Sequence, residues 1–194
     1  GLLPNNFPGD GEEPEYNAID APLWFVLAVE AFGRLRREPS KPSPLIGAVR
    51  DVIASYRKGT AFGISVGPDL LVTGGEPGRA LTWMDAVVDG EPVTPRRGRP
   101  VEVNALWHAA LKAAARLERL SAENARARDL EADAWRVGRH FNETFWSEED
   151  QRLFDVVGDD GHAGEGGAGE AGEGGADGVD DLAAGFAVVE GAVE

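Results

Sequence analysis

Apolar residues recur along most of this chain at helical spacing, and the first such segment is apolar on every side. It runs over residues 23–29, after an aspartate that can cap a helix, Asp20, and a proline suited to the first turn, Pro22. A helix without a polar face has no side to present to water. The pattern therefore predicts a buried helix that starts near Asp20.

Three further segments each predict a helix with a single apolar stripe. The second helix is expected over residues 45–56, with Gly59 at its end, and the third over residues 103–120, where alanines allow close packing. Ser121 is expected to cap a fourth helix that ends near Phe145. The aromatic residues of the fourth segment are expected in the core rather than at a sugar-binding platform: Trp135, Phe141, Phe145 and Trp146.

Short extended segments and a glycine-rich tail complete the pattern. Alternating apolar residues at 62–66, a Gly-Pro-Asp turn and residues 70–73 predict a short β-hairpin, and residues 153–157 predict a brief strand. Residues 158–178 are almost only Gly, Ala, Glu and Asp, which cannot bury enough apolar surface to offset the chain entropy. We expect a disordered loop or linker there, followed by a divergent segment over residues 179–194.

Composition narrows the classes of partner. The 194 residues, 42% of them hydrophobic, suffice for one sizeable domain or for a piece of a larger one. A formal net charge of -15 disfavours binding to nucleic acid or to an anionic membrane, so a neutral partner fits better. The chain has no cysteine, which excludes disulfides, a thiolate nucleophile and a cysteine-based zinc site.

The basic residues and the start of the chain suggest the solvent conditions and the cellular location of the protein. Lysine is rare among the basic residues, which suggests a surface adapted to high salt, although GC-rich coding also favours arginine over lysine. No apolar run reaches the roughly 20 residues that span a bilayer. The start at Gly1 has neither an initiating Met nor the pattern of a signal peptide. We expect a soluble, cytoplasmic chain that is the interior of a longer protein.

The candidate chemistry lies in loops that place carboxylates among aromatic residues. Trp83 precedes Asp85 by two residues, and Glu102 is followed by Trp107. Glycoside hydrolysis needs one protonated carboxyl and one ionised carboxylate, and indole rings can stack on sugars and desolvate a neighbouring acid. The same spacing is also compatible with core tryptophans and with Asp85 as a helix cap.

Other kinds of site find no support in the sequence. The histidines, His108, His140 and His162, are far apart and lack metal-ligand spacing, and the acidic tail lacks the pattern of a calcium loop. The glycine-rich run at residues 74–78 is not followed by the Lys-Ser or Lys-Thr of a nucleotide site. We therefore expect neither a metal nor an organic cofactor.

Several motifs, in order along the chain, resemble the glucosidase domain of glycogen debranching enzymes, the amylo-alpha-1,6-glucosidase family. The resemblance covers residues 1 to about 157. The motifs are Gly1-Leu-Leu-Pro-Asn-Asn-Phe, Glu15-Tyr-Asn-Ala-Ile-Asp-Ala-Pro-Leu-Trp24-Phe, Leu81-Thr-Trp-Met-Asp-Ala86, Val93-Thr-Pro-Arg and Gly98-Arg-Pro-Val-Glu-Val-Asn-Ala-Leu-Trp107.

The resemblance implies an all-α fold, an (α/α)6 toroid of the six-hairpin glycosidase kind, incomplete in residues 1–157 and with the short β-hairpin in a loop. It implies that Asp85 is the general acid that protonates the glycosidic oxygen of an α-1,6-linked glucose. It implies an α-glucan as substrate and residues that line the sugar pocket: Tyr16, Asn17, Asp20, Trp24, Trp83, Glu102, Asn104 and Trp107. For Asp20, a role as helix cap stays equally open.

The second carboxylate is where the sequence departs from the family. The resemblance implies an inverting mechanism, whose base would lie near a downstream Leu-Arg-Pro-Asn motif. This chain has instead an aspartate pair before a leucine, so Asp180 or Asp181 is the candidate, with Asp181 preferred. Two hypotheses follow: a debranching glucosidase, or a truncated, non-catalytic glucan-binding or vestigial segment. The remainder of the same domain is then an expected partner, because the helices needed to close the toroid are missing.

Overall fold

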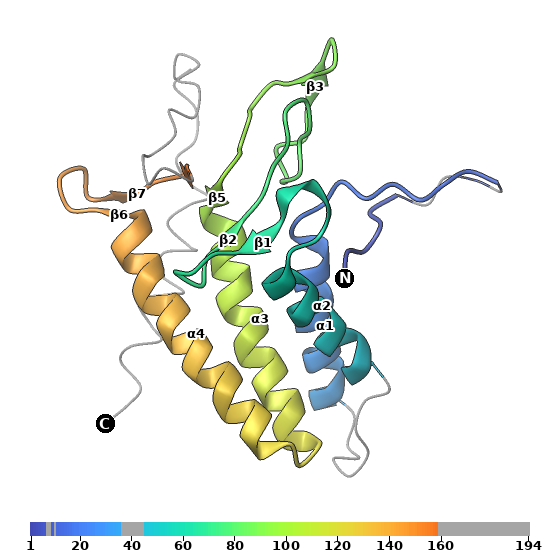
Figure 1. Cartoon of the computed structure of the whole chain (residues 1–194), viewed down its shortest axis with the longest axis vertical. Coiled ribbons are helices and arrows are strands. Elements are labelled where there is room, and N and C mark those ends of the chain that lie inside the picture. The colour runs from blue at the N-terminus through green and yellow to red at the C-terminus, as the bar shows by residue number, and fades with distance from the viewer. Residues whose placement is uncertain (7–8, 10, 36–44, 159–194) are drawn as a thin grey trace.

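Four helices and a set of two-residue strands make up the computed structural model, which describes residues 1–6, 9, 11–35 and 45–158. The helices are α1 (Ala21–Leu35), α2 (Ile46–Lys58), α3 (Val101–Leu120) and α4 (Asn124–Phe145). Figure 1 shows that α1 and α3 begin at the end of the molecule where the strands gather, whereas α2 and α4 run back toward that end. The expected linker after Gly158 and the segment over residues 179–194 lie outside the described residues.

Helix α3 is the centre of the packing. It lies against α4 along most of its length and also contacts α1 and α2. Its buried alanines, Ala110, Ala113, Ala114 and Ala115, allow the neighbouring helices to approach closely. The described residues are mainly helical, in agreement with the sequence, while four helices do not by themselves establish a closed toroid of six helical pairs.

Within the described residues the strands form four antiparallel pairs, all of them short. The predicted hairpin is confirmed as β1 (Ser65–Val66) and β2 (Val72–Thr73), after a single 3-10 turn over Ala61–Gly63. The other pairs are β3 (Val87–Val88) with β4 (Glu91–Pro92), β5 (Arg99–Pro100) with β8 (Val156–Val157), and β6 (Trp146–Ser147) with β7 (Arg152–Leu153). The expected strand at 153–157 is thus divided between β7 and β8.

The predicted end of α2 is confirmed, whereas the predicted start of α4 is wrong. Gly59 ends α2 with a φ of 90°, a backbone conformation that favours glycine. Ser121 does not cap α4, because its hydroxyl donates to the carbonyl of Leu117 at 3.1 Å and so closes the end of α3. Helix α4 begins only at Asn124.

Helix α1 is not buried on all sides, contrary to the prediction. Leu23, Val26 and Val29 lie in the core, whereas Trp24, Phe32 and Leu35 are each more than half exposed. The reason is that α2 and α3 cover only one side of the helix, and no described element covers the other. The exposed side of α1 is consequently apolar.

The aromatic residues of α4 divide between core and surface. Phe141 and Phe145 are buried as expected, with ring centroids 4.8 Å apart. Trp135 is 67% exposed, so its predicted place in the core is wrong, and the guanidinium of Arg139 lies 5.5 Å from its ring centroid. Trp146 follows the last turn of α4 and is also exposed. Helical spacing alone did not distinguish the buried phenylalanines from the exposed tryptophans, because α4 packs on one side only and the spacing does not say which side.

Two buried glutamates tie the helices together. Glu118 of α3 is 2% exposed and receives two hydrogen bonds from Arg50 of α2, at 2.7 and 2.6 Å. Arg126 of α4 lies 4.0 Å from the same carboxylate. Glu30 of α1 is also buried and accepts one hydrogen bond from Arg116 of α3, at 2.8 Å. Ion pairs thus join α1, α2 and α4 to α3.

His108 gives the helix packing a dependence on pH. Burial, and next the charge of Lys112, lower the pKa of His108 from 6.5 to about 4. Above pH 6.5 the imidazole is neutral in both the folded and the unfolded chain and has no effect on stability. As the pH falls toward 4, the unfolded chain takes up the proton first, so the free energy of unfolding decreases. We expect a loss of about 2 kcal/mol, discounted for partial exposure.

A comparison of His108→Gln with the unaltered chain tests this prediction. Urea unfolding at pH 7 and at pH 4.5 should show a smaller loss of stability in the variant. An equal loss in both proteins would contradict a role for His108, since it would assign the pH dependence to carboxyl groups alone.

None of the described helices combines the length and the apolar character needed to cross a membrane.

Candidate active site

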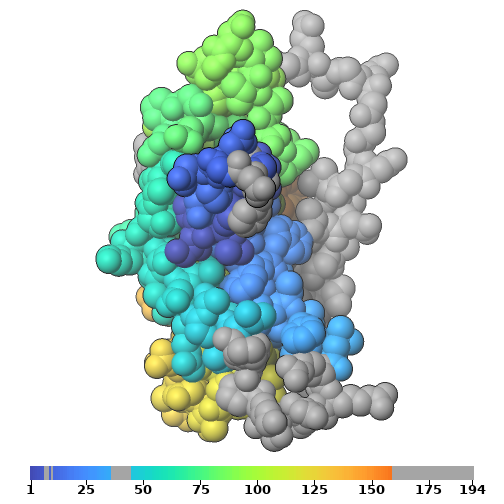
Figure 2. Space-filling model, turned by 90° about the vertical axis from the view of Figure 1, so that its right-hand side faces the viewer, coloured from blue at the N-terminus to red at the C-terminus, as the bar shows by residue number. Residues whose placement is uncertain are grey.

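Asp85 lies in a loop that leaves the body of the molecule and returns to the same place. We call residues 75–97 the acid loop. Gly74 and Gly98 close its base by exchanging two backbone hydrogen bonds, of 2.9 and 3.0 Å. Gly98 has a φ of 106°, and a Cβ at this position would lie 2.6 Å from the carbonyl oxygen of Val157. The base therefore requires glycine. Figure 2 shows the upper part of the acid loop as a lobe beyond the ends of the helices.

A chain of hydrogen bonds and ring contacts fixes the acid loop to the N-terminal motif and the core. The amide of Ile19 donates to the carbonyl of Leu81 at 2.9 Å, and the carbonyl of Ile19 accepts from the Tyr56 hydroxyl at 2.5 Å. Burial, and next the charge of Asp20, raise the pKa of Tyr56, so this hydroxyl stays a donor. Tyr56 in turn stacks on Trp107, with centroids 5.7 Å apart. The motif that contains Ile19 is thereby connected to the motif that contains Leu81 directly, and to the motif that contains Trp107 through Tyr56.

The structure separates the alternatives for Asp85 and its neighbouring tryptophan. Asp85 precedes β3 and lies in no helix, so the alternative of a helix cap is wrong. Its side chain is exposed. Trp83 is 66% exposed, so it is not a core residue, and its ring is open to a ligand at the surface of the acid loop.

The residues predicted from the N-terminal motif flank Ile19, whose amide is hydrogen-bonded to the acid loop. Tyr16 is exposed, Asn17 and Asp20 are half-buried, and Trp24 is exposed on the first turn of α1. The side-chain oxygen of Asn17 is buried, and no hydrogen-bond donor among the described residues reaches it. A buried acceptor without a partner is costly, so this oxygen is suited to a water or a ligand hydroxyl.

Two predicted sugar-binding residues belong to the core instead. Trp107 is 1% exposed, and its indole nitrogen donates to the carbonyl of Leu70 at 3.1 Å. Asn104 is fully buried: its oxygen accepts from the amide of Val72 at 2.7 Å, and its nitrogen donates to the carbonyls of Val72 and Pro100 at 3.0 and 2.9 Å. With these groups occupied, both residues fasten the β1–β2 hairpin to α3 rather than bind a sugar in this structure.

Glu102 is held by an arginine that sequence reasoning did not assign to the site. Both carboxylate oxygens of Glu102 accept hydrogen bonds from Arg96, one of them at 2.7 Å. The buried Arg96 also donates to the carboxylate of Asp155, at 2.6 and 2.9 Å. Burial lowers the pKa of Arg96, but the hydrogen bonds to Glu102 and Asp155 raise it more, so the guanidinium stays charged. Arg96 thus joins the acid loop to α3 and to the segment before β8.

One signal for Arg96 was present in the sequence. It ends the Val93-Thr-Pro-Arg motif, which carried part of the family resemblance. Asp155 had no such signal, because it lies 59 residues from Arg96 and only the fold brings the two together. Glu102 was predicted to line the sugar pocket, and in this structure each of its oxygens accepts a hydrogen bond from Arg96.

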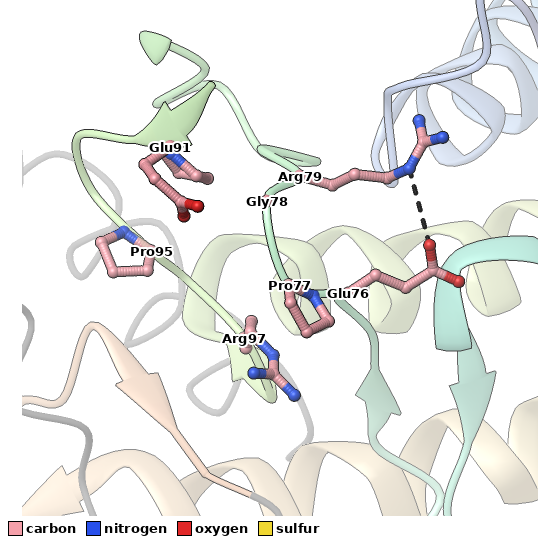
Figure 3. Close-up of a pocket in the computed structure, with 8 residues that line it drawn as sticks. Glu76, Pro77, Gly78, Arg79, Glu91, Pro95 and Arg97 are labelled. Atoms are coloured by element: carbon pink, nitrogen blue, oxygen red, sulfur yellow. Dashed lines mark ion pairs between the residues drawn. The ribbon is translucent and has the colours of Figure 1, made fainter. Parts of the chain in front are cut away.

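Two hollows adjoin the acid loop. The first has a volume of about 210 Å³ and lies between the two limbs of the loop, where Figure 3 shows Glu76, Pro77, Gly78 and Arg79 on one side and Glu91, Pro95 and Arg97 on the other. The second, of about 460 Å³, lies at the base of the loop, lined by Arg97 and Thr73 and otherwise by glycines: Gly63, Gly74, Gly75, Gly98 and Gly158. Asp181, the predicted base, lies outside the described residues.

Comparison with known proteins bears on the fold and the family. The crystal structure of a GH78 family rhamnosidase of Bacillus sp. GL1 is similar over 76% of this chain, with a TM-score of 0.56 and 18% sequence identity. The chain spans 14% of the length of that structure. A search of the curated proteins finds no match. Residues 1–165 match the family described as amylo-alpha-1,6-glucosidase. The chain therefore belongs to the amylo-alpha-1,6-glucosidase family.

Proposed function

We propose that this chain contributes to the hydrolysis of α-1,6-glucosidic branch linkages in glycogen or a related α-glucan, with Asp85 as general acid. The observation that carries the proposal is the hydrogen bond of 2.9 Å between Ile19 and Leu81. It brings the segment with Tyr16 and Trp24 beside the loop with Asp85, so that a carboxyl and several exposed aromatic rings occupy one end of the molecule.

Each side chain then has a task set by its chemistry. Asp85 donates a proton to the glycosidic oxygen as the bond to the anomeric carbon breaks, which lets the rest of the glucan leave as an alcohol. Trp83 and Trp24 present exposed indole rings on which the apolar faces of glucose can stack. The unpartnered oxygen of Asn17 can accept a hydrogen bond from a sugar hydroxyl. Glu102 acts through Arg96 to position the acid loop.

The reaction also needs a second carboxylate, which activates water on the opposite face of the sugar if the mechanism is inverting. We assign this role to Asp181 on the basis of its place after β8. No metal is called for in such a mechanism. Among the described residues no three histidine or acidic side chains are grouped so as to hold a metal ion.

A second candidate function is a glucan-binding segment without catalysis. The uncovered apolar side of α1 favours it, because exposed Phe32 and Leu35 leave apolar surface that a working glucosidase domain would cover. In that case the exposed rings would still bind a glucan, while no glucose would be released.

Glucose release separates the two functions. The chain should be incubated with isomaltose and, in parallel, with maltose, and free glucose should be measured enzymatically. A debranching glucosidase releases glucose from the α-1,6-linked disaccharide in preference to the α-1,4-linked one. Retained binding of either sugar without any release would establish the glucan-binding function instead.

A further inference from the structure

We propose that the hollow between the two limbs of the acid loop is a glucosyl subsite, which holds one sugar of the glucan next to the bond that Asp85 protonates. This inference rests on the proposed function, because it names the part of the protein that receives the substrate. It concerns Pro77, Glu91, Pro92, Pro95 and Arg97, none of which the sequence motifs assigned to sugar binding.

The hollow has rigid apolar walls. Pro77 lies on the first limb, and Pro92 and Pro95 lie on the second. Proline rings fix the backbone, so little conformational entropy is lost when a ligand enters. The volume of about 210 Å³ is below that of pockets for drug-sized ligands, so it suits a single sugar ring rather than a longer chain.

The charged residues around the hollow divide into a satisfied pair and two free groups. Glu76 and Arg79 pair with each other at 3.5 Å, and Figure 3 shows this pair directed away from the space between the limbs. Arg79 also lies over the ring of Phe62, 4.5 Å from its centroid. Within the described part of the chain, neither Glu91 nor Arg97 takes part in an ion pair.

An acceptor and a donor on the second limb of the loop suit a neutral polyol. Glu91 can only accept hydrogen bonds when ionised, and Arg97 can only donate them. Sugar hydroxyls do both, and hydrogen bonds to charged groups are the stronger kind. The net charge of -15 disfavours an anionic ligand, which leaves a neutral sugar as the ligand class that matches.

The hollow is connected to Asp85 by the backbone. The amide of Val93 donates to the carbonyl of Ala86 at 2.9 Å, and Pro92 is opposite Val87 in the β3–β4 pair. Ala86 directly follows Asp85. The limb that carries Pro92 and Pro95 is therefore paired with the segment that directly follows the acid.

Titration of the full chain with panose, an α-1,6-glucosyl maltose, tests the subsite. The Asp85→Asn variant prevents turnover during the titration, and backbone amide shifts are followed by NMR. We expect shifts at Gly78, Glu91 and Arg97, and a Kd raised at least about tenfold by Arg97→Ala and by Glu91→Gln. The matched controls are Arg128→Ala, an exposed arginine on α4, and Asp89→Asn, in the same hairpin but outside the hollow.

The outcomes separate the subsite from the function. Shifts confined to other parts of the chain, or an unchanged Kd in both Arg97→Ala and Glu91→Gln, would overturn the subsite even if the unaltered chain releases glucose. Binding in the hollow without any glucose release by the unaltered chain would support the subsite and count against the proposed hydrolysis.

Discussion

Arg50→Gln lowers the free energy of unfolding by about 3 kcal/mol, because it leaves the buried carboxylate of Glu118 without its main partner. The two hydrogen bonds from Arg50, at 2.7 and 2.6 Å, satisfy both oxygens of that carboxylate. Arg126, at 4.0 Å, compensates only in part. For a chain of this length the loss corresponds to a melting temperature lower by about 6 to 12 °C in calorimetry.

A control on the same helix separates burial from charge. Arg57 of α2 pairs with Asp133 of α4 at 2.5 Å, but that pair is partly exposed and Arg136 remains near the aspartate. Arg57→Gln should therefore cost less than about 1 kcal/mol. Adding Glu118→Gln to Arg50→Gln should recover part of the loss, since the buried charge is then removed. Equal losses for Arg50→Gln and Arg57→Gln would show that burial of Glu118 does not matter.

Asp85→Asn lowers the rate of glucose release from an α-1,6-linked substrate by a factor of about 10² to 10⁴, the usual contribution of a general acid. Asparagine keeps the shape of the side chain but cannot supply the proton. The exposed position of Asp85 implies little change in stability, so the melting temperature should stay within about 1 °C. Loss of activity without loss of stability is the expected signature.

Asp89→Asn is the matched control for this variant. Asp89 lies in the same loop, at the β3–β4 turn with a φ of 52°, a conformation that asparagine tolerates. It should leave the rate unchanged. If Asp89→Asn and Asp85→Asn lower the rate equally, the effect is one of loop conformation, and the assignment of Asp85 as the acid fails.

The helices and the first hairpin were predictable because their signals are local. The apolar stripes of α2, α3 and α4, the glycine that ends α2 and the turn between β1 and β2 depend on residues within a few positions of one another. The exposure of Trp24 on α1 was not predictable in the same way. A helix that is apolar all round gives no sign of which side its neighbours cover.

At the candidate site, too, the sequence predicts features that depend on local residues but not those that depend on distant contacts. Asp85 was predicted from the short motif that surrounds it, and its role as the acid stays a prediction. Trp107 and Asn104 lie in an equally clear motif, but whether a buried amide or indole meets the backbone or a ligand depends on the distant β1–β2 hairpin. The ion pairs of Arg96 also depend on tertiary contacts, since Asp155 approaches it from 59 positions along the chain.

The closing of the acid loop follows from backbone geometry that composition does not reveal. In the sequence, Gly98 is one more glycine in a chain with 26 of them. Only the fold shows its φ of 106° and the Val157 carbonyl oxygen, which lies 2.6 Å from the place that a Cβ would occupy. The hollow beside Pro77 likewise forms only when the two limbs of the loop lie together (Figure 3).

The most direct test of the central claim is proton NMR of glucose release from a glycogen limit dextrin by the full chain. We expect free glucose to appear and its first signals to be those of the β-anomer, because an inverting enzyme acts on an α-linkage. We also expect Asp85→Asn to release glucose far more slowly. A chain that binds the dextrin and releases no glucose over the same period would contradict the claim that it hydrolyses branch linkages.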